Sequence, residues 1–337
     1  MSTNEAAWLL KPKGDLRVFP AAFPVPSQDE IVINNQAFAI QPLDATVLGE
    51  ESIDVPYPAI LGNGVAGIVE EAGGSVTKFK KGDRVISDTP SYQLKQTKYG
   101  GWQKYVVGRE ATTVHLAKHT TFDDAAVMPF ALLTAVAALK LKLGMDKPGT
   151  LHSGKALIWS ASGSVGGYAV QYAASVGYEV VTTASPRKFD YVRGLGANEV
   201  LDYNDDHIVL KLRDLGPYEF VMSASGDVKG ANAISDILQP FGGEFASTHP
   251  KTEAMQLAPN VSLLYDLFSM ATQKKENEGF TNWWYEDYLP LALAGGVKPT
   301  PLEKRSGGLY RVQEACDDIL GGRNMSKIVL NPQASFL

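Results

Sequence analysis

The 337-residue chain is poor in cysteine, since Cys316 is its single thiol. One thiol forms no disulfide within the chain, which favours a reducing compartment, and a structural zinc site with four thiolate ligands is excluded. Cys316 falls in a helix-like stretch and is interpreted as a core residue rather than a nucleophile. The five histidines are scattered and are interpreted as ordinary surface or core residues: His115, His119, His152, His207 and His249.

The chain also lacks an excess of positive charge and a long hydrophobic run. Its formal net charge of −6 argues against a general nucleic-acid or membrane-surface role. The longest apolar stretch, residues 125–139, contains Pro129 and Thr134 and is too short to span a membrane. The beginning, MSTNEAAWLL, has an acid where a signal peptide would be basic. We therefore expect a cytoplasmic protein without nucleic-acid or membrane partners.

A strand–turn–helix–strand pattern over residues 156–183 carries the strongest signal in the sequence. An apolar run is followed by the turn Ala161-x-Gly163-x-x-Gly166, a helix-like segment, a stop at Gly177 and a second strand. Small residues allow a sharp turn, close approach of a pyrophosphate and tight helix packing, and the helix N-terminus attracts phosphate. The alternative is a small-residue turn that serves helix packing alone. The βαβ context favours dinucleotide binding.

The residues after the second strand indicate which dinucleotide binds. An NAD site usually has an acid there that accepts from the ribose 2′-hydroxyl, but this chain has Thr183-Ala-Ser-Pro-Arg-Lys188. A hydroxyl and two cations suit a 2′-phosphate through charge-assisted hydrogen bonds. The sequence therefore predicts NADPH over NADH, against the alternative of a solvated basic loop.

The rest of the chain predicts two domains. Residues 1 to about 120 consist mostly of short strands, with a hairpin around Lys13-Gly14, whereas residues 150–250 alternate strand and helix as in a parallel sheet with helices on both faces. Residues 262–293 are predicted to be helical and aromatic-rich. The tail adds a helix over 308–320 and a strand over 327–330.

This order resembles the medium-chain dehydrogenase/reductase superfamily over nearly the whole chain. The resemblance is carried by Pro58-x-Ile-Leu-Gly62-x-x-x-Ala66-Gly67-x-Val69, Phe79-x-x-Gly82-Asp83-Arg84-Val85, Thr134-Ala135, Ser160-Ala-Ser-Gly-Ser-Val-Gly166, Leu195-Gly196-Ala197-x-x-Val200-x-Asp202-Tyr203 and Ser326-Lys-Ile-Val329. Within the superfamily the chain is similar to zinc-independent quinone oxidoreductases and to fungal trans-acting enoyl reductases. The resemblance implies an α/β fold: a doubly wound Rossmann domain (125–267) and a mostly β, GroES-like catalytic domain (1–124 and 268–337).

Zinc independence follows from the ligands that a metal would need. A catalytic zinc would require a cysteine near Thr46 and a His-Glu pair after Gly62, but this chain has Asn63-Gly64 there. Without a metal, an acceptor whose negative charge delocalises is favoured. Hydride addition to an enone or enoyl thioester leaves an enolate that needs hydrogen-bond donors and a proton.

The resemblance also implies site residues for NADPH. Ser162, Gly163, Ser164 and Val165 would line the pyrophosphate, and the 2′-phosphate would be held by Ser185, Lys188 and Tyr203, with Arg187 as a further candidate. Thr134 and Ser247 or Thr248 would contact the nicotinamide region, Gln41 to Asp44 would face its ribose, and Ser326 and Lys327 would close over the ring. Simpler alternatives stay open: Tyr203 as a strand-end aromatic, Thr134 as a hydroxyl bonded to its own helix, and Lys327 as a solvated lysine.

The chemical end of the site departs from the family pattern. Gln41 replaces the usual Asn, Gly64 replaces the common acid, and Thr46 stands where fungal enoyl reductases can carry Lys. The catalytic proton donor is therefore unknown, with water, Thr134, Tyr57, Tyr92 or Tyr99 as candidates.

Three functions remain open at this point. The first is NADPH-dependent reduction of an activated C=C bond, in a small-molecule or carrier-bound acyl substrate of secondary metabolism. The second is quinone or carbonyl reduction, and the third is NADPH binding without turnover. A carrier-protein partner and a monomer or homodimer are expected from the resemblance alone. The cluster Trp283 to Tyr288 either lines a pocket or packs in the core.

Overall fold

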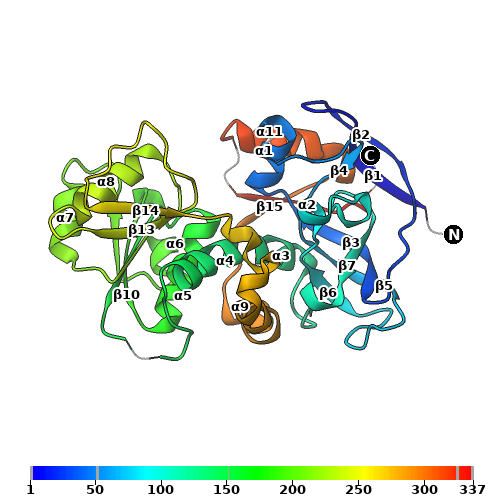
Figure 1. The fold of residues 1–337 in the computed structure, drawn as a ribbon, viewed down its shortest axis with the longest axis horizontal. Helices are drawn as coiled ribbons and strands as arrows, with labels where there is room; N and C mark the ends of the chain where they lie inside the picture. Colours follow the sequence, from blue (N-terminus) through cyan, green and yellow to red (C-terminus); the bar gives the residue numbers. More distant parts are fainter. Residues whose placement is uncertain (1–2, 51–52, 151, 324–325, 335–337) are drawn as a thin grey trace. The chain divides into compact units, whose positions relative to one another are not determined.

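The computed structural model describes residues 3–50, 53–150, 152–323 and 326–334. The chain forms two compact units. The first unit consists of Met1–Phe130 and Asn282–Leu337, and the second unit of Ala131–Thr281. Each unit has its own β-sheet, as Figure 1 shows, and each is described separately below.

The second unit is built on a parallel sheet with the strand order β11-β10-β9-β12-β13-β14, six strands in the described part of the chain. Numbered within the unit this order is 3-2-1-4-5-6, the order of a Rossmann dinucleotide-binding domain. The strands are β9 (Lys155–Trp159), β10 (Glu179–Ala184), β11 (Glu199–Asp202), β12 (Phe220–Ser223), β13 (Gly243–Ser247) and β14 (Val261–Tyr265).

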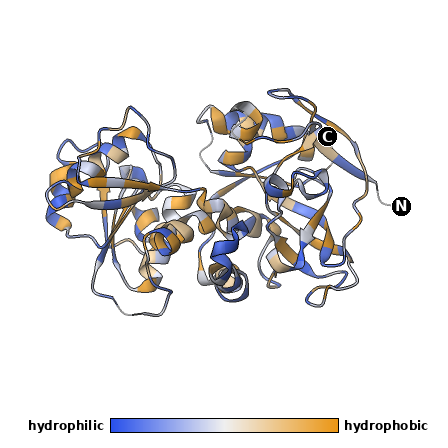
Figure 2. Cartoon of the chain, viewed as in Figure 1, coloured by the Kyte–Doolittle hydropathy of each residue, from blue (hydrophilic) through white to orange (hydrophobic). Residues whose placement is uncertain are grey.

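Helices alternate with these strands and cover the sheet. Strand residues such as Leu157, Val181 and Phe245 are fully buried and join one core cluster with helix residues such as Ile234. Parallel strands covered by helices are typically apolar, and the middle of β9 and of β12 is an apolar run, whereas β10, β11 and β13 also carry polar residues. Figure 2 shows apolar, orange segments within this sheet. The helices after β9 are α5 (Ser164–Val176), η4 (Pro186–Lys188), α6 (Phe189–Arg193), α7 (Ile208–Leu215) and α8 (Val228–Leu238).

The first unit is mostly β-structure. Its larger sheet has the order β15-β16-β3-β5-β6-β8, with β7 paired to β3, and its smaller sheet has the order β2-β1-β4. The strands are β1 (Asn4–Leu9), β2 (Leu16–Ala21), β3 (Glu30–Ala39), β4 (Ala59–Ile60), β5 (Val65–Ala72), β6 (Arg84–Ser87), β7 (Tyr105–Arg109), β8 (Thr113–His115), β15 (Leu302–Arg305) and β16 (Lys327–Leu330).

Short helices connect the strands of the first unit and link the two units. Thr121 caps the helix that follows β8, because its side chain accepts from the Asp124 N–H. The remaining helices are α1 (Pro42–Glu50), α2 (Ser91–Leu94), η1 (Thr97–Tyr99), η2 (Glu110–Thr112), α3 (Phe122–Val127), α4 (Pro129–Val136), η3 (Ala137–Lys142), η5 (Phe268–Gln273), η6 (Lys275–Asn277), α9 (Glu278–Trp283), η7 (Trp284–Tyr288), α10 (Leu289–Leu291), η8 (Ala292–Gly296), η9 (Gly308–Arg311) and α11 (Val312–Leu320).

Most sequence predictions of secondary structure are confirmed, and one is wrong. The amino-terminal hairpin, the five strands between residues 156 and 247, the Gly177 cap in a left-handed conformation and the tail strand are all present. Residues 262–293 are not helical throughout, because Val261–Tyr265 forms β14 and pairs with β13. The edge strand β15 was not predicted from the sequence.

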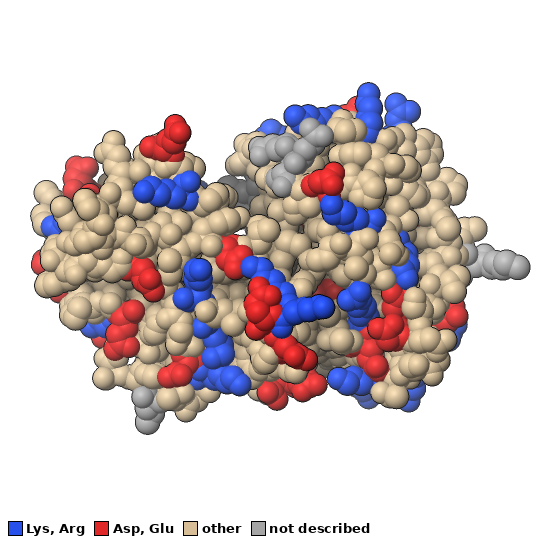
Figure 3. Space-filling view, in the orientation of Figure 1, with Lys and Arg blue, Asp and Glu red and all other residues tan. Residues whose placement is uncertain are grey.

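The helical stretch Phe122–Lys142 is strongly apolar. Residues Phe122–Lys142 are long and apolar enough to cross a membrane by length and composition, yet 72% of the most apolar window is buried inside the structure. A buried core helix of a soluble protein has the same properties. The face shown in Figure 3 carries interspersed acidic and basic side chains.

Glu30, at the start of β3, ties together three segments of the first unit. Its carboxylate accepts from Lys98 Nζ at 2.8 Å, from the Ser27 N–H at 2.7 Å and from the Tyr99 hydroxyl. Burial alone raises the pKa of Glu30, but the hydrogen bonds from Lys98 and Tyr99 outweigh it and lower the pKa to about 2. The network therefore stabilises the fold when Glu30 is ionised.

We expect Glu30→Gln to lower the free energy of unfolding by about 1–3 kcal/mol at pH 7, because the hydrogen bonds from the half-buried Lys98 and from Tyr99 lose their charged acceptor. The folded-state pKa is depressed, so the wild-type advantage is present above about pH 4.5 and declines as the pH falls toward 2. Urea unfolding at several pH values measures this. Glu314→Gln, in an exposed ion pair with Arg311, is the control and should change stability by less than about 0.5 kcal/mol. A pH-independent difference for Glu30→Gln would contradict the prediction.

Candidate functional site

The bend between β9 and α5 is fixed by backbone geometry. Ser160 has a φ of 71°, an unusual value for a residue with a side chain. Its N–H donates to Thr183 Oγ1 at 3.0 Å, and the next N–H, that of Ala161, donates to the Thr183 carbonyl at 2.9 Å. The end of β9 is therefore held against the end of β10, and α5 begins directly after this contact.

The two glycines of the bend have different surroundings. A Cβ on Gly166 would lie 2.1 Å from the Ser160 carbonyl oxygen, so only glycine lets α5 pack this close to the strand. A Cβ on Gly163 would meet nothing within 4 Å, although Gly163 precedes the first turn of α5. Open space in front of a helix N-terminus suits a pyrophosphate, so this bend fits a dinucleotide.

Candidate residues for the 2′-phosphate gather at the adjoining strand ends. Ser185 follows β10 and its carbonyl accepts from the Lys188 N–H at 2.8 Å, while Arg187 is exposed in η4. Tyr203 follows β11, whose last residue pairs with the last residue of β10. Lys229 of α8, which the sequence did not single out, lies 5.3 Å above the Tyr203 ring. Three cations thus come from the loop and the helix around these strand ends.

The remaining candidates of the second unit come from β13 and α4. Ser247 ends β13 and donates to the His249 carbonyl at 2.8 Å, and Thr248 donates to the Ala224 carbonyl at 3.2 Å. Thr134 is buried on α4, with 9% of its surface exposed. The structure thus places the candidates Ser162 to Val165, Ser185 to Lys188, Tyr203, Ser247 and Thr248 after the carboxyl ends of parallel strands, where ligands of such sheets bind. Their cofactor contacts stay predictions.

The first unit brings three cofactor candidates together around a buried carboxyl group. Asp44 is 0% exposed and accepts from the Gln41 N–H at 3.2 Å and from the Tyr92 hydroxyl. Lys327 of β16 donates to Gln41 Oε1. Burial raises the pKa of Asp44 to about 7, against the lowering effect of Tyr92, and burial lowers the pKa of Lys327 to about 8. We call Gln41, Asp44, Tyr92 and Lys327 the Asp44 cluster.

The other candidates of this unit lie in several segments of the first unit. Ser326 is half-buried and directly precedes Lys327. The hydroxyl of Tyr99 donates to Glu30, and Tyr57 is half-buried beside Pro58. Cys316 is fully buried, and burial raises the pKa of its thiol, which confirms its prediction as a core residue. Tyr92 is thus a tyrosine candidate that donates a hydrogen bond to Asp44.

A second buried acid was missed by the sequence interpretation. Asp88 directly follows β6, is 7% exposed, and accepts from the Tyr285 hydroxyl at 2.9 Å. Burial raises the pKa of Asp88 to about 6, although the Tyr285 hydrogen bond opposes this. An acid immediately after a buried strand was a signal available in the sequence. The aromatic cluster of Trp283, Trp284, Tyr285 and Tyr288 is buried in the first unit.

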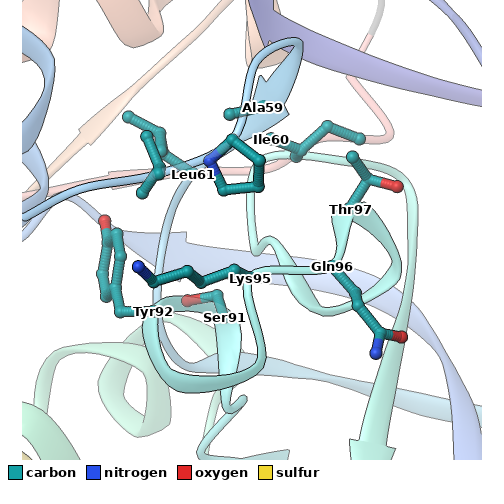
Figure 4. Close-up of a pocket in the computed structure, with 10 residues that line it drawn as sticks. Ala59, Ile60, Leu61, Ser91, Tyr92, Lys95, Gln96 and Thr97 are labelled. Atoms are coloured by element: carbon teal, nitrogen blue, oxygen red, sulfur yellow. The ribbon is translucent and has the colours of Figure 1, made fainter.

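A small pocket lies beside Tyr92, as Figure 4 shows. Apolar residues of the segment from Val55 to Leu61 form one side, and polar residues between Ser91 and Thr97 form the other. Ser91 Oγ is buried and has no hydrogen-bond partner within the described residues. Lys95 at the pocket is paired with Asp54, with 3.1 Å between Nζ and Oδ2.

The comparisons with known proteins agree with this geometry. Residues 27–118 match the alcohol dehydrogenase GroES-like domain. The chain is 31% identical over 334 residues to the zinc-binding alcohol dehydrogenase domain-containing protein cipB of Emericella nidulans, covering 97% of this chain and 98% of that protein. It is 31% identical over 339 residues to the trans-enoyl reductase himH of Aspergillus japonicus, covering 97% of each.

A solved structure supports the fold over the same range. An alcohol dehydrogenase superfamily protein from Novosphingobium aromaticivorans superposes with a TM-score of 0.80 at 24% identity and covers 97% of this chain and 99% of that chain. The full-length relatives, the GroES-like match and the Rossmann strand order define one class: the chain belongs to the medium-chain dehydrogenase/reductase superfamily. Within it, the chain falls in the branch of the fungal trans-acting enoyl reductases. Members of this superfamily use nicotinamide cofactors.

The glycines of the bend give a paired test. We expect Gly166→Ala to lower stability and dinucleotide affinity together, because its Cβ would meet backbone. Gly163→Ala should leave the melting temperature nearly unchanged, since its φ of −82° suits alanine, but should weaken dinucleotide binding at least about tenfold. Thermal melting and calorimetric titration measure both. Wild-type affinity in Gly163→Ala would show that no pyrophosphate lies against this residue.

Proposed function

We propose that this protein is an NADPH-dependent reductase that transfers hydride to an activated C=C bond of an enone or enoyl thioester without a metal ion. The observation that carries the proposal is the bend between β9 and α5 on a Rossmann sheet, followed by a loop with cations and no acid. Full-length similarity to a protein named as a trans-enoyl reductase supports the choice of substrate class.

NADPH is favoured over NADH by the charges around the end of β10. Arg187 and Lys188 lie in η4, and Lys229 approaches Tyr203 beyond the adjoining strand. A 2′-phosphate carries a charge that these cations attract, whereas an acid at this place would repel it. The reduced nicotinamide supplies the hydride when bound, and the residues of the chain bind and orient it.

Metal-free chemistry is supported by the side chains around Gly62. The described residues contain no group of three or more His, Cys, Asp or Glu side chains that could hold a metal ion. The name of one relative includes zinc binding, but Asn63 and Gly64 of this chain offer no imidazole or carboxylate ligand. An acceptor that spreads its negative charge over an enolate needs hydrogen-bond donors instead.

Quinone or carbonyl reduction is the second candidate function, and a non-catalytic NADPH-binding role is the third. Both roles use the same dinucleotide site, so they are distinguished by which acceptor, if any, the protein reduces. We also propose a cytoplasmic location, and an acyl substrate that is free or attached to a carrier protein. Co-purification with an acyl-carrier domain tests the partner.

The cofactor preference has a direct test. We expect a dissociation constant for NADPH at least about tenfold lower than for NADH. Lys188→Ala should weaken NADPH binding about tenfold to a hundredfold and leave NADH binding nearly unchanged, because only NADPH carries the 2′-phosphate. Arg193→Ala, on the next helix in an exposed pair with Asp190, is the matched control. Equal binding of the two cofactors to the wild type would refute NADPH preference.

The reaction is tested by NADPH consumption with a crotonyl thioester, a small enone and a small quinone. We expect turnover of the first two, and no loss of activity after treatment with a chelator, because the mechanism uses no metal ion. Product analysis by mass spectrometry identifies the reduced bond. Turnover of the quinone alone would select the second function, and tight NADPH binding without any turnover would select the third.

A further inference from the structure

Asp88 and Tyr285 form a buried acid–phenol pair within the first unit. The Tyr285 hydroxyl donates to Asp88 Oδ2 at 2.9 Å, and 7% and 8% of the two residues are exposed. No Lys, Arg or His side chain pairs with Asp88 in the described ranges of the chain. A carboxyl group buried without a cation needs an explanation, because structural acids in proteins are usually paired.

The neighbouring strand leaves space beside this pair. A Cβ on Gly64 would lie 3.8 Å from Asp88 Oδ1, so the glycine places no side chain against the second carboxyl oxygen. Asn63 Oδ1 and Thr89 Oγ1, on the residues that flank Gly64 and Asp88, are buried without a hydrogen-bond partner in the described part of the chain. Buried polar atoms usually have a hydrogen-bond partner, so these two side chains offer polar groups that a ligand could bind.

A continuous set of contacts joins the pair to the Asp44 cluster. Tyr92 donates to Asp44 and accepts from the Gly62 N–H, with 3.4 Å between nitrogen and oxygen. Gly62 and Gly64 both have left-handed φ values, of 94° and 83°. The segment Gly62-Asn63-Gly64 therefore connects the surroundings of Asp44, which Tyr92 binds, to those of Asp88, which Tyr285 binds.

The backbone around Tyr285 is unusual as well. Residues Trp284–Tyr288 form a π-helical turn, a rare geometry that often occurs at functional sites. Trp284 is fully buried, and the rings of Trp283 and Tyr288 stack with centroids 5.0 Å apart. The hydrogen bond to Asp88 orients the Tyr285 hydroxyl within this buried turn, as a proton donor requires.

We propose that Tyr285 is the catalytic proton donor of the reductase and that Asp88 is the positioning residue that resupplies its proton. This inference rests on the proposed function, because it needs a substrate that becomes an enolate. Neither Tyr285 nor Asp88 is among the proton-donor candidates predicted from the sequence, which are Tyr57, Tyr92, Tyr99, Thr134 and water.

The proton transfer balances without a further reactant. After the β-carbon has received a hydride from NADPH, the electrons of the C=C bond form an enolate. The α-carbon then forms a C–H bond with the proton of Tyr285 Oη, as the O–H bond breaks. The resulting phenolate takes a proton from the Asp88 carboxyl group, and Asp88 takes one from water. Burial raises the pKa of Asp88 to about 6, so a fraction of the carboxyl groups is protonated near neutral pH.

Two isosteric variants test this role. We expect Tyr285→Phe to lower kcat with a crotonyl thioester about a hundredfold, and Asp88→Asn about tenfold, with the NADPH dissociation constant within about twofold of wild type. In D₂O, the wild type should place deuterium on one face of the α-carbon. Tyr285→Phe should lose this stereospecificity, because water then protonates the enolate from either face. Tyr288→Phe removes a buried hydroxyl from the same π-helical turn and is the matched control, with wild-type kcat and stereochemistry.

The outcomes separate the two proposals. If the wild type reduces the thioester while Tyr285→Phe keeps full kcat and stereospecific α-deuteration, the donor role is wrong and the proposed function stands. If the wild type reduces neither the thioester nor an enone, both are wrong. If Tyr285→Phe fails to fold, Asp88→Asn is measured by the same readouts. A wild-type kcat and an unchanged solvent isotope effect in Asp88→Asn would then overturn the proton relay.

Discussion

The candidate site of the first unit depends on one buried carboxyl group, that of Asp44. A carboxylate without contact with water must obtain its hydrogen bonds from the protein, or it becomes protonated. Its partners come from its own helix start and from Tyr92, 48 residues away, and the Lys327 charge comes from the tail strand. The carboxyl end of the chain is thereby tied to the segment before α1. Loss of one partner would leave the buried charge less well compensated.

The dinucleotide end was predictable because it is local. A turn of small residues between a strand and a helix predicts a bend that suits a pyrophosphate, and the alternation of strand and helix predicts the parallel sheet that the structure has. The family resemblance assigned Ser185 and Tyr203 to one site, and the structure places both just after the paired ends of β10 and β11. Lys229 was not predicted because it belongs to α8, the helix after β12, and not to the loops after β10 and β11. The edge strand β14 escaped because its five residues adjoin an aromatic, helix-forming region.

The chemical end was not predictable because its pairs are remote in sequence. Asp88 and Tyr285 are 197 residues apart, and Lys327 and Gln41 are 286 residues apart. Sequence patterns identify the residue types but give no partner at such distances. Tyr92 was a proton-donor candidate only because it carries a hydroxyl. The fold shows that this hydroxyl donates to the buried acid Asp44. The same limit explains why Tyr285 was read as one member of an aromatic cluster.

Gly64 connects the altered residues of the site to its chemistry. In the family pattern an acid is common at this position, and this chain has a glycine with a φ of 83°. Any side chain there would be strained and would occupy the space next to Asp88. Strands β5 and β6 pair so that Asp88 lies across from Gly64. The carboxyl group missing at Gly64 is therefore present opposite it, at Asp88, where we propose that burial and the Tyr285 hydrogen bond make it a proton-relaying acid.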